Sequence, residues 1–285
     1  MTYYSFIGFS EPVSSWTHLI ASIVFLIVGL KMLYHARGNN LKSLSLLIYV
    51  FSGVFLFAMS GVYHLLNKGT TANYVLQILD HAGIYLLIAG SLTPFQIILL
   101  RGYKRWIPLV FMWILAITGL TLTAIFFENM PEGLILTFFL GMGWMSLFTV
   151  WFIRKTSINT IKLIAIGGLL YTIGAMIDFT KWPTLIEKVI EPHEVFHLFV
   201  VAAALVHLYA VLLISRKPIS QSLTVNITKF PEYYSGIITS ENMNFTGKSE
   251  ESIKQQLQDW IRESYFEEFA PNEIRIRYYR EEHLS

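Results

Sequence analysis

Seven long apolar segments, separated by short polar connections, constrain this chain more than any other feature of its sequence. They run approximately over residues 13–34, 43–66, 73–100, 106–127, 133–153, 160–180 and 193–214. Each holds about 20 or more residues, which is enough for a helix to cross roughly 30 Å of hydrocarbon. Lipid cannot satisfy exposed backbone groups, and these runs are neither short nor alternating as barrel strands are. We therefore predict an all-α membrane protein whose core is a seven-transmembrane helix bundle.

The composition agrees with this fold and narrows the chemistry. Only 14% of the 285 residues are charged, against about 25% in soluble domains. The formal net charge of +2 gives no case for nucleic acid as a partner. The chain has no cysteine, so disulfides, thiolate metal sites and cysteine nucleophiles are excluded. Any metal must therefore be held by His, Asp or Glu.

The N-terminus does not read as a cleavable signal peptide. Residues 1–12 carry no Lys or Arg, and the first apolar segment is too long for the hydrophobic region of such a peptide. We expect this segment to stay in the membrane as the first helix.

Lysine and arginine are distributed unevenly between the two sets of connections. One side receives nine, namely Arg37, Lys42, Arg101, Lys104, Arg105, Arg154, Lys155, Arg216 and Lys217. The other side receives three, namely Lys68, Lys181 and Lys188. Because cytoplasmic loops carry an excess of these residues, we expect the N-terminus outside and the C-terminus in the cytoplasm.

The chain becomes polar and charge-rich after residue 216, which predicts a transmembrane domain over 1–216 and a soluble domain over 217–285. Strands are predicted at 223–228, 233–239 and 274–279, with an amphipathic helix from Ser249 to about Phe266 between the last two. Ser249 is a suitable N-cap for that helix. We expect a small cytoplasmic α+β module of β-β-α-β order. It carries no catalytic signature, so a docking role and a ligand- or partner-binding role both stay open.

Polar and ionisable residues inside membrane helices are costly, so each one is by default a hypothesis of function to be weighed against a structural role. Most of them fall in one leaflet, the outer one under the orientation above: His18, Ser60, His64, Asp80, His81, Asp178, His193, Glu194 and His197. His207 lies deeper, where a hydrogen bond within the bundle is the simpler interpretation. The same simple interpretation competes evenly with a site role for His18 and His81. Asp178, close to Lys181, reads as an interfacial residue.

A histidine pair at helical spacing is the strongest metal signal. His193 and His197 are four residues apart, which places both imidazoles on one helix face. His64 would complete three nitrogen ligands and leave a fourth position for water, as in catalytic zinc sites.

The string from His193 to His197 also fits the H-E-x-x-H pattern of metalloproteases, in which the glutamate is the general base. Intramembrane metalloproteases add a downstream aspartate ligand, which the rest of this helix does not supply. We therefore assign Glu194 no base role, although it stays a candidate proton acceptor.

These residues resemble the hemolysin III family, part of the superfamily of adiponectin and progestin receptors and alkaline ceramidases. The matching pieces cover about residues 8–215: Glu11 to His18, Ser60-x-x-x-His64, Leu79-Asp80-His81 with Thr93-Pro94, His193-x-x-x-His197, and His207. The resemblance implies Zn²⁺ bound by His64, His193 and His197, with Asp80 and Ser60 beside the water at the metal. It does not support Glu194 as essential.

The leading functional hypothesis is zinc-assisted hydrolysis of a lipid amide or ester, with membrane lipids as partners. Asp80 would orient or deprotonate the water, and Ser60 would donate a hydrogen bond to the oxygen that gains negative charge. The alternatives are a receptor-like or membrane-homeostasis protein with structural zinc, a pore-forming hemolysin, and an intramembrane protease.

Overall fold

The seven predicted membrane helices are present in the computed structural model, which describes residues 10–100, 102–152, 158–187, 189–216, 222–264, 271 and 273–280. The helices are α1 (Pro12–His35), α2 (Asn40–Leu65), α3 (Thr71–Leu99), α4 (Gly102–Ile125), α5 (Glu132–Phe152), α6 (Ile158–Thr180) and α7 (Pro192–Ser215). All seven are long and apolar enough to cross a membrane. Their ends lie within a few residues of the predicted ends, so the chain forms the multi-pass bundle that the apolar segments predicted.

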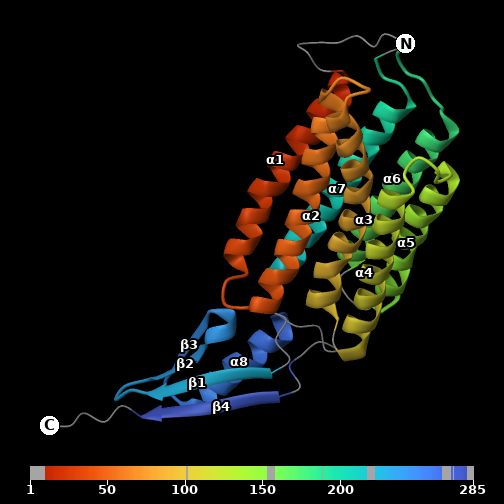
Figure 1. Cartoon of the computed structure of the whole chain (residues 1–285). Coiled ribbons are helices and arrows are strands. Elements are labelled where there is room, and N and C mark those ends of the chain that lie inside the picture. The colour runs from red at the N-terminus through yellow and green to blue at the C-terminus, as the bar shows by residue number, and fades with distance from the viewer. Residues whose placement is uncertain are drawn as a thin grey trace.

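The helices run up and down, so the odd-numbered helices begin at one end of the bundle and the even-numbered helices begin at the other (Figure 1). Helix α3 is the most buried of the seven and packs against α2, α4, α5 and α7. The starts of α1, α3 and α7 therefore meet the ends of α2 and α6 at one end of the bundle. We call this the histidine end, because it carries His64, His193 and His197.

Small residues let α1 approach α2 closely near the histidine end. A β-carbon placed on Gly61 of α2 would lie 2.8 Å from Leu19 Cδ2 and 3.2 Å from the backbone nitrogen of Leu19. One turn further along α1 toward its start, the Ser15 hydroxyl donates a hydrogen bond of 2.7 Å to the Gly61 carbonyl. This contact holds α1 against the stretch of α2 that carries Ser60 and His64.

The C-terminal region forms a four-stranded sheet covered by one helix. Its elements are β1 (Ser222–Lys229), β2 (Tyr234–Ile238), a 3-10 turn (Thr239–Glu241), β3 (Met243–Gly247), α8 (Glu250–Ser264) and β4 (Glu273–Arg280). The strand order is β3-β2-β1-β4, with β1 parallel to β4 and the other pairs antiparallel. The buried core of this region joins the inner side chains of the strands to α8: Leu223, Val225, Ile227, Ile238, Phe245, Ile253 and Leu257.

The predicted β-β-α-β order missed one strand. Helix α8 begins as expected, with the Ser249 hydroxyl accepting a hydrogen bond of 3.2 Å from the Ser252 amide. The missed strand, β3, is short and follows Asn242, which has a left-handed backbone with φ of 52°. Of its five residues, Phe245 alone is fully buried, so the strand has little hydrophobic pattern.

Some predicted features fall outside the described residues. Arg101, Arg154, Lys155, Lys188 and Lys217, five of the twelve loop cations, belong to that group, as does the predicted end of α8 near Phe266. The predicted domain boundary at residue 217 falls there as well.

The sheet lies at the opposite end of the bundle from the histidine end, below the connection between α1 and α2 (Figure 1). Lys42, in the first turn of α2, is 6% exposed and interacts electrostatically with Glu241, which precedes β3. Burial raises the pKa of Glu241 to about 7, against the opposing attraction of Lys42. A buried lysine of the bundle thus lies near a half-buried carboxyl group of the C-terminal region.

Candidate metal centre

Three imidazoles from two distant stretches of chain meet at the histidine end. One nitrogen from each of His64, His193 and His197 can be chosen so that all lie within 4.8 Å of one another. The Nε2 atoms of His193 and His197 are 3.1 Å apart, and the ring centres of His64 and His197 are 4.6 Å apart. His64 and His197 are both 2% exposed, whereas His193 is only partly buried. Water can therefore approach the group from the His193 side.

Local structure explains why the two α7 histidines share one face. Pro192 occupies the first turn of α7, where its missing N–H costs nothing. The Glu194 side chain accepts a hydrogen bond of 3.0 Å from the Glu191 amide, which completes a capping box. The helix is thus regular from its first turn, so residues four apart lie one above the other.

The three imidazoles fit a zinc ion. Two nitrogens each about 2.0–2.1 Å from zinc at a tetrahedral angle are about 3.3 Å apart, close to the 3.1 Å between His193 and His197. The His64 Nε2 is buried with no hydrogen-bond partner among the described residues. A buried nitrogen lone pair without a donor is costly, and a cation would satisfy it. Among these residues the group of close potential ligands has three members, so a tetrahedral ion held by them would take its fourth ligand from elsewhere.

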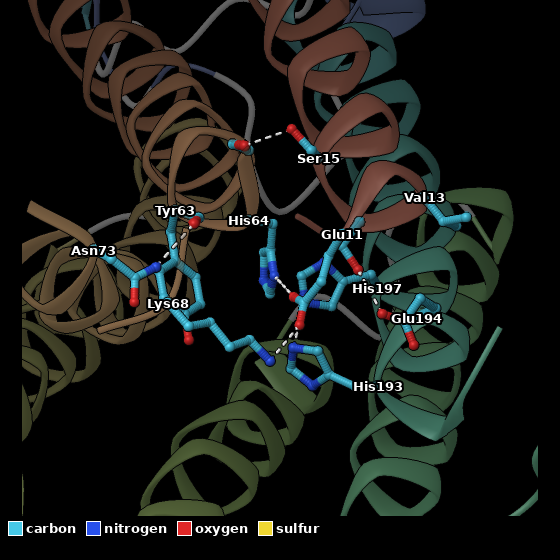
Figure 2. A network of polar contacts seen from close by, with 12 residues as sticks. Glu11, Val13, Ser15, Tyr63, His64, Lys68, Asn73, His193, Glu194 and His197 are labelled. Carbon is cyan, nitrogen blue, oxygen red and sulfur yellow. Dashed lines mark hydrogen bonds and ion pairs between the residues drawn. The ribbon is translucent and has the colours of Figure 1, made fainter. Parts of the chain in front are cut away.

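Glu11, just before α1, reaches His64. Its Oε2 accepts a hydrogen bond from His64 Nδ1, and its Oε1 lies 2.6 Å from Lys68 Nζ (Figure 2). Burial alone would raise the pKa of Glu11, but His64 and Lys68 outweigh that effect and lower the pKa to about 2. Glu11 is therefore a carboxylate at neutral pH. The sequence placed it inside the family motif but gave no sign that it touches His64.

Asp178 has a partner that its position did not predict. It lies near the end of α6, and its Oδ1 is 3.1 Å from His193 Nδ1 and 3.5 Å from Lys181 Nζ. The interpretation as an interfacial residue is therefore incomplete, because the carboxylate contacts one of the three clustered imidazoles. The sequence showed Lys181 as a nearby partner for Asp178. It did not show the contact with His193, which depends on how α7 packs against α6.

The two predicted catalytic residues lie at the same end of the bundle. Ser60 is fully buried one turn below His64, and its hydroxyl has no hydrogen-bond partner among the described residues. Asp80, 8% exposed at the start of α3, is close enough to interact electrostatically with His193 and Tyr63. Both groups are near the three imidazoles, and their roles stay predictions.

Glu194, the glutamate of the H-E-x-x-H string, makes contacts that do not suit a general base. Its Oε2 accepts from the Glu191 amide, and its Oε1 lies 3.5 Å from the Ser14 hydroxyl on α1. At 5% exposure it is held inside the junction of α1 and α7. Its carboxylate thus ends in a helix cap, which argues against the metalloprotease alternative.

The other three histidines singled out in the sequence, His18, His81 and His207, divide into two kinds. His207 Nε2 is 3.2 Å from the Ile164 carbonyl, and His81 Nδ1 is 2.9 Å from the Gln77 carbonyl, so both hydrogen-bond within the bundle. His18 differs, because its ring stacks on His197 at 4.1 Å and neither of its nitrogens has a hydrogen-bond partner among the described residues. His18 is therefore a fourth imidazole of the cluster, next to the three candidate ligands.

Comparisons with known proteins show which proteins this chain is similar to. A family model described as "Haemolysin-III related" matches residues 6–208. "Hemolysin-3" of Bacillus cereus is 30% identical over 205 residues, which cover 71% of this chain and 90% of the relative. "Hemolysin-3 homolog" of Bacillus subtilis is 31% identical over 196 residues, covering 68% and 85%. "Monocyte to macrophage differentiation factor" of Homo sapiens is 28% identical over 211 residues, covering 71% and 83%.

Proposed function

This chain belongs to the haemolysin-III-related family of multi-pass membrane proteins, and on that premise we propose that it is a zinc-dependent hydrolase of lipid amides or esters. The observation that carries the proposal is the group of three buried or partly buried imidazoles at the end of a membrane bundle. Three protein ligands and an open position are typical of catalytic zinc, whereas structural zinc is usually closed by four.

Zinc bound there would lower the pKa of a water molecule to about 7 and polarise a carbonyl group. Asp80 would accept the proton that the water loses. The Ser60 hydroxyl, which is buried and without a partner among the described residues, would donate a hydrogen bond to the carbonyl oxygen as it gains charge. A lipid is the proposed substrate because the imidazoles lie near the ends of membrane-spanning helices, where the amide and ester groups of bilayer lipids would come close to them.

Metal and turnover can be measured on the same preparations of full-length protein in detergent. We expect zinc bound to the wild type, and zinc lost from a variant with His64, His193 and His197 all changed to alanine. Equal zinc in both would end the proposal.

For turnover, fatty acid released from lipid amides and esters is followed by mass spectrometry. Ser60→Ala should lower the rate by about 10²–10³ if its hydroxyl stabilises the developing charge. Ser52→Ala is the matched control, because Ser52 is a buried serine of α2 whose hydroxyl bonds to the Ile48 carbonyl of its own helix. Zinc that is needed for thermal stability, without release of fatty acid from any substrate, would instead favour the receptor-like protein with structural zinc.

We also propose that the histidine end faces outward and that residues 217–285 form a cytoplasmic domain. The distribution of Lys and Arg between the loops supports this orientation. At the histidine end the described loop lysines, Lys68 and Lys181, both lie beside carboxylates, which leaves that end with little excess positive charge.

A further inference from the structure

Two of the three candidate ligands share an arrangement that the third lacks. His64 donates from Nδ1 to Glu11, and His193 donates from Nδ1 to Asp178. Each carboxylate is also next to a lysine, Lys68 in the first case and Lys181 in the second. His197 Nδ1 has no hydrogen-bond partner among the described residues, and its ring is supported by stacking on His18.

These contacts determine which nitrogen of each ring can bind a cation. A neutral imidazole carries one N–H and one lone pair, and a carboxylate can only accept. Because Nδ1 of His64 and of His193 faces a carboxylate, the proton of each ring stays on Nδ1 and the lone pair on Nε2. The Nε2 of His193 faces His197, and the Nε2 of His64 is buried without a partner among the described residues.

We propose that Glu11 and Asp178 are positioning residues, which fix the rings of His64 and His193 with Nε2 toward one metal ion. A carboxylate behind a metal-binding histidine sets its tautomer, orients the ring and makes it a more basic ligand. The inference rests on the proposed metal site but does not depend on lipid turnover.

The Glu11 carboxylate can be removed without releasing the segment that carries it. Backbone hydrogen bonds from the Ser10 amide to the Leu65 carbonyl (3.3 Å) and from the Glu11 amide to the His64 carbonyl (3.0 Å) hold this segment on the end of α2. A side-chain substitution leaves these bonds in place, so a change in metal binding reports on the carboxylate itself.

The test measures zinc affinity of the full-length protein in detergent by competition with a chromogenic chelator. Glu11→Ala and Asp178→Ala should each weaken zinc binding by about 10–100-fold. Glu11→Gln should weaken it less than Glu11→Ala, because the amide oxygen can still accept from His64. Glu132→Ala is the matched control, since Glu132 is an exposed carboxylate at the same end of the bundle, and it should bind zinc as the wild type does.

Cobalt(II) in place of zinc gives a second readout, because its visible absorption reports the ligand geometry. We expect the band to shift in the Glu11 and Asp178 variants and to stay unchanged in Glu132→Ala. If the alanine variants fail to fold, Glu11→Gln and Asp178→Asn decide by the same two measurements.

Zinc affinity within about threefold of wild type, with an unchanged cobalt band, would overturn the positioning role. His64→Ala separates this failure from a failure of the site. If His64→Ala loses zinc while the carboxylate variants keep it, the metal site stands and the positioning role falls. If His64→Ala also keeps zinc, the proposed site itself is wrong.

Discussion

Several residues at the histidine end make contacts that cannot be inferred from the residues next to them in the sequence. The spacing of His193 and His197 predicted their shared face, because helix geometry alone determines it. Glu11 and Asp178 could not be paired with their imidazoles in this way, because each contact joins two different elements, and their packing cannot be inferred from residue spacing within one helix. Glu194 illustrates the opposite case. The sequence around it matches the H-E-x-x-H motif, but in the fold its side chain caps the start of α7.

Glu194 provides a prediction at this scale. Replacing it with alanine removes the acceptor for the Glu191 amide and should cost about 0.5–2 kcal/mol of stability, as the loss of a helix cap does. Glu194→Gln keeps an acceptor oxygen and should be less destabilised. Both variants should still bind zinc. The measurements are apparent melting temperature and bound zinc, and loss of zinc from Glu194→Gln would contradict the capping role.

Whole elements were predictable where one strong signal dominates. Seven apolar runs indicated seven helices. Each run is long enough to cross a bilayer, and lipid cannot hydrogen-bond the exposed backbone groups of other structures. Strand β3 was not predicted, because its single fully buried side chain, Phe245, gives almost no period-two pattern. The distance between neighbouring helices could not be predicted either, because the sequence does not show whether a glycine faces another helix or lipid.

Helix α6 tests that last point with two adjacent glycines. A β-carbon on Gly167 would overlap the ring of His207 on α7, whereas one on Gly168 would meet nothing within 4 Å. Gly167→Ala should therefore destabilise the bundle by about 1–3 kcal/mol, the usual cost of overpacking. Gly168→Ala should be neutral or slightly stabilising. Thermal unfolding of both variants in the same detergent gives the comparison, and equal melting temperatures would refute it.

At the scale of the whole molecule, the two ends of the bundle differ in what they carry. One end holds the imidazoles, and the C-terminal sheet lies at the other (Figure 1). The orientation predicted from the loop charges can be tested without background, because the chain has no native cysteine. A maleimide that does not cross membranes should label Glu132→Cys on intact cells, and Arg37→Cys only after permeabilisation. The reverse pattern would invert the proposed orientation.

The junction between the bundle and the sheet should depend on pH through Glu241. Its pKa in the folded protein is raised to about 7, from an ordinary value of 4.5, so the folded state holds the proton more tightly. The stability that this proton contributes is complete below the ordinary value and is lost as the pH rises through about 7. Wild-type protein should therefore lose more thermal stability between pH 6 and pH 8 than Glu241→Gln, which cannot ionise.

The control for this comparison is Glu251→Gln, an exposed carboxylate of the same region that should keep the wild-type pH dependence. If Glu241→Gln and the wild type show the same change between the two pH values, the carboxyl group of Glu241 does not govern the junction.

Helix α2 takes part in both ends, because Lys42 in its first turn faces Glu241 and His64 in its last turn faces Glu11. The two residues are 22 positions apart, which corresponds to about 33 Å of helix. A fusion protein or affinity tag joined directly after β4 would therefore be attached at the end of the molecule away from the imidazoles. Protein immobilised through such a tag would present its histidine end to added metal or lipid without obstruction.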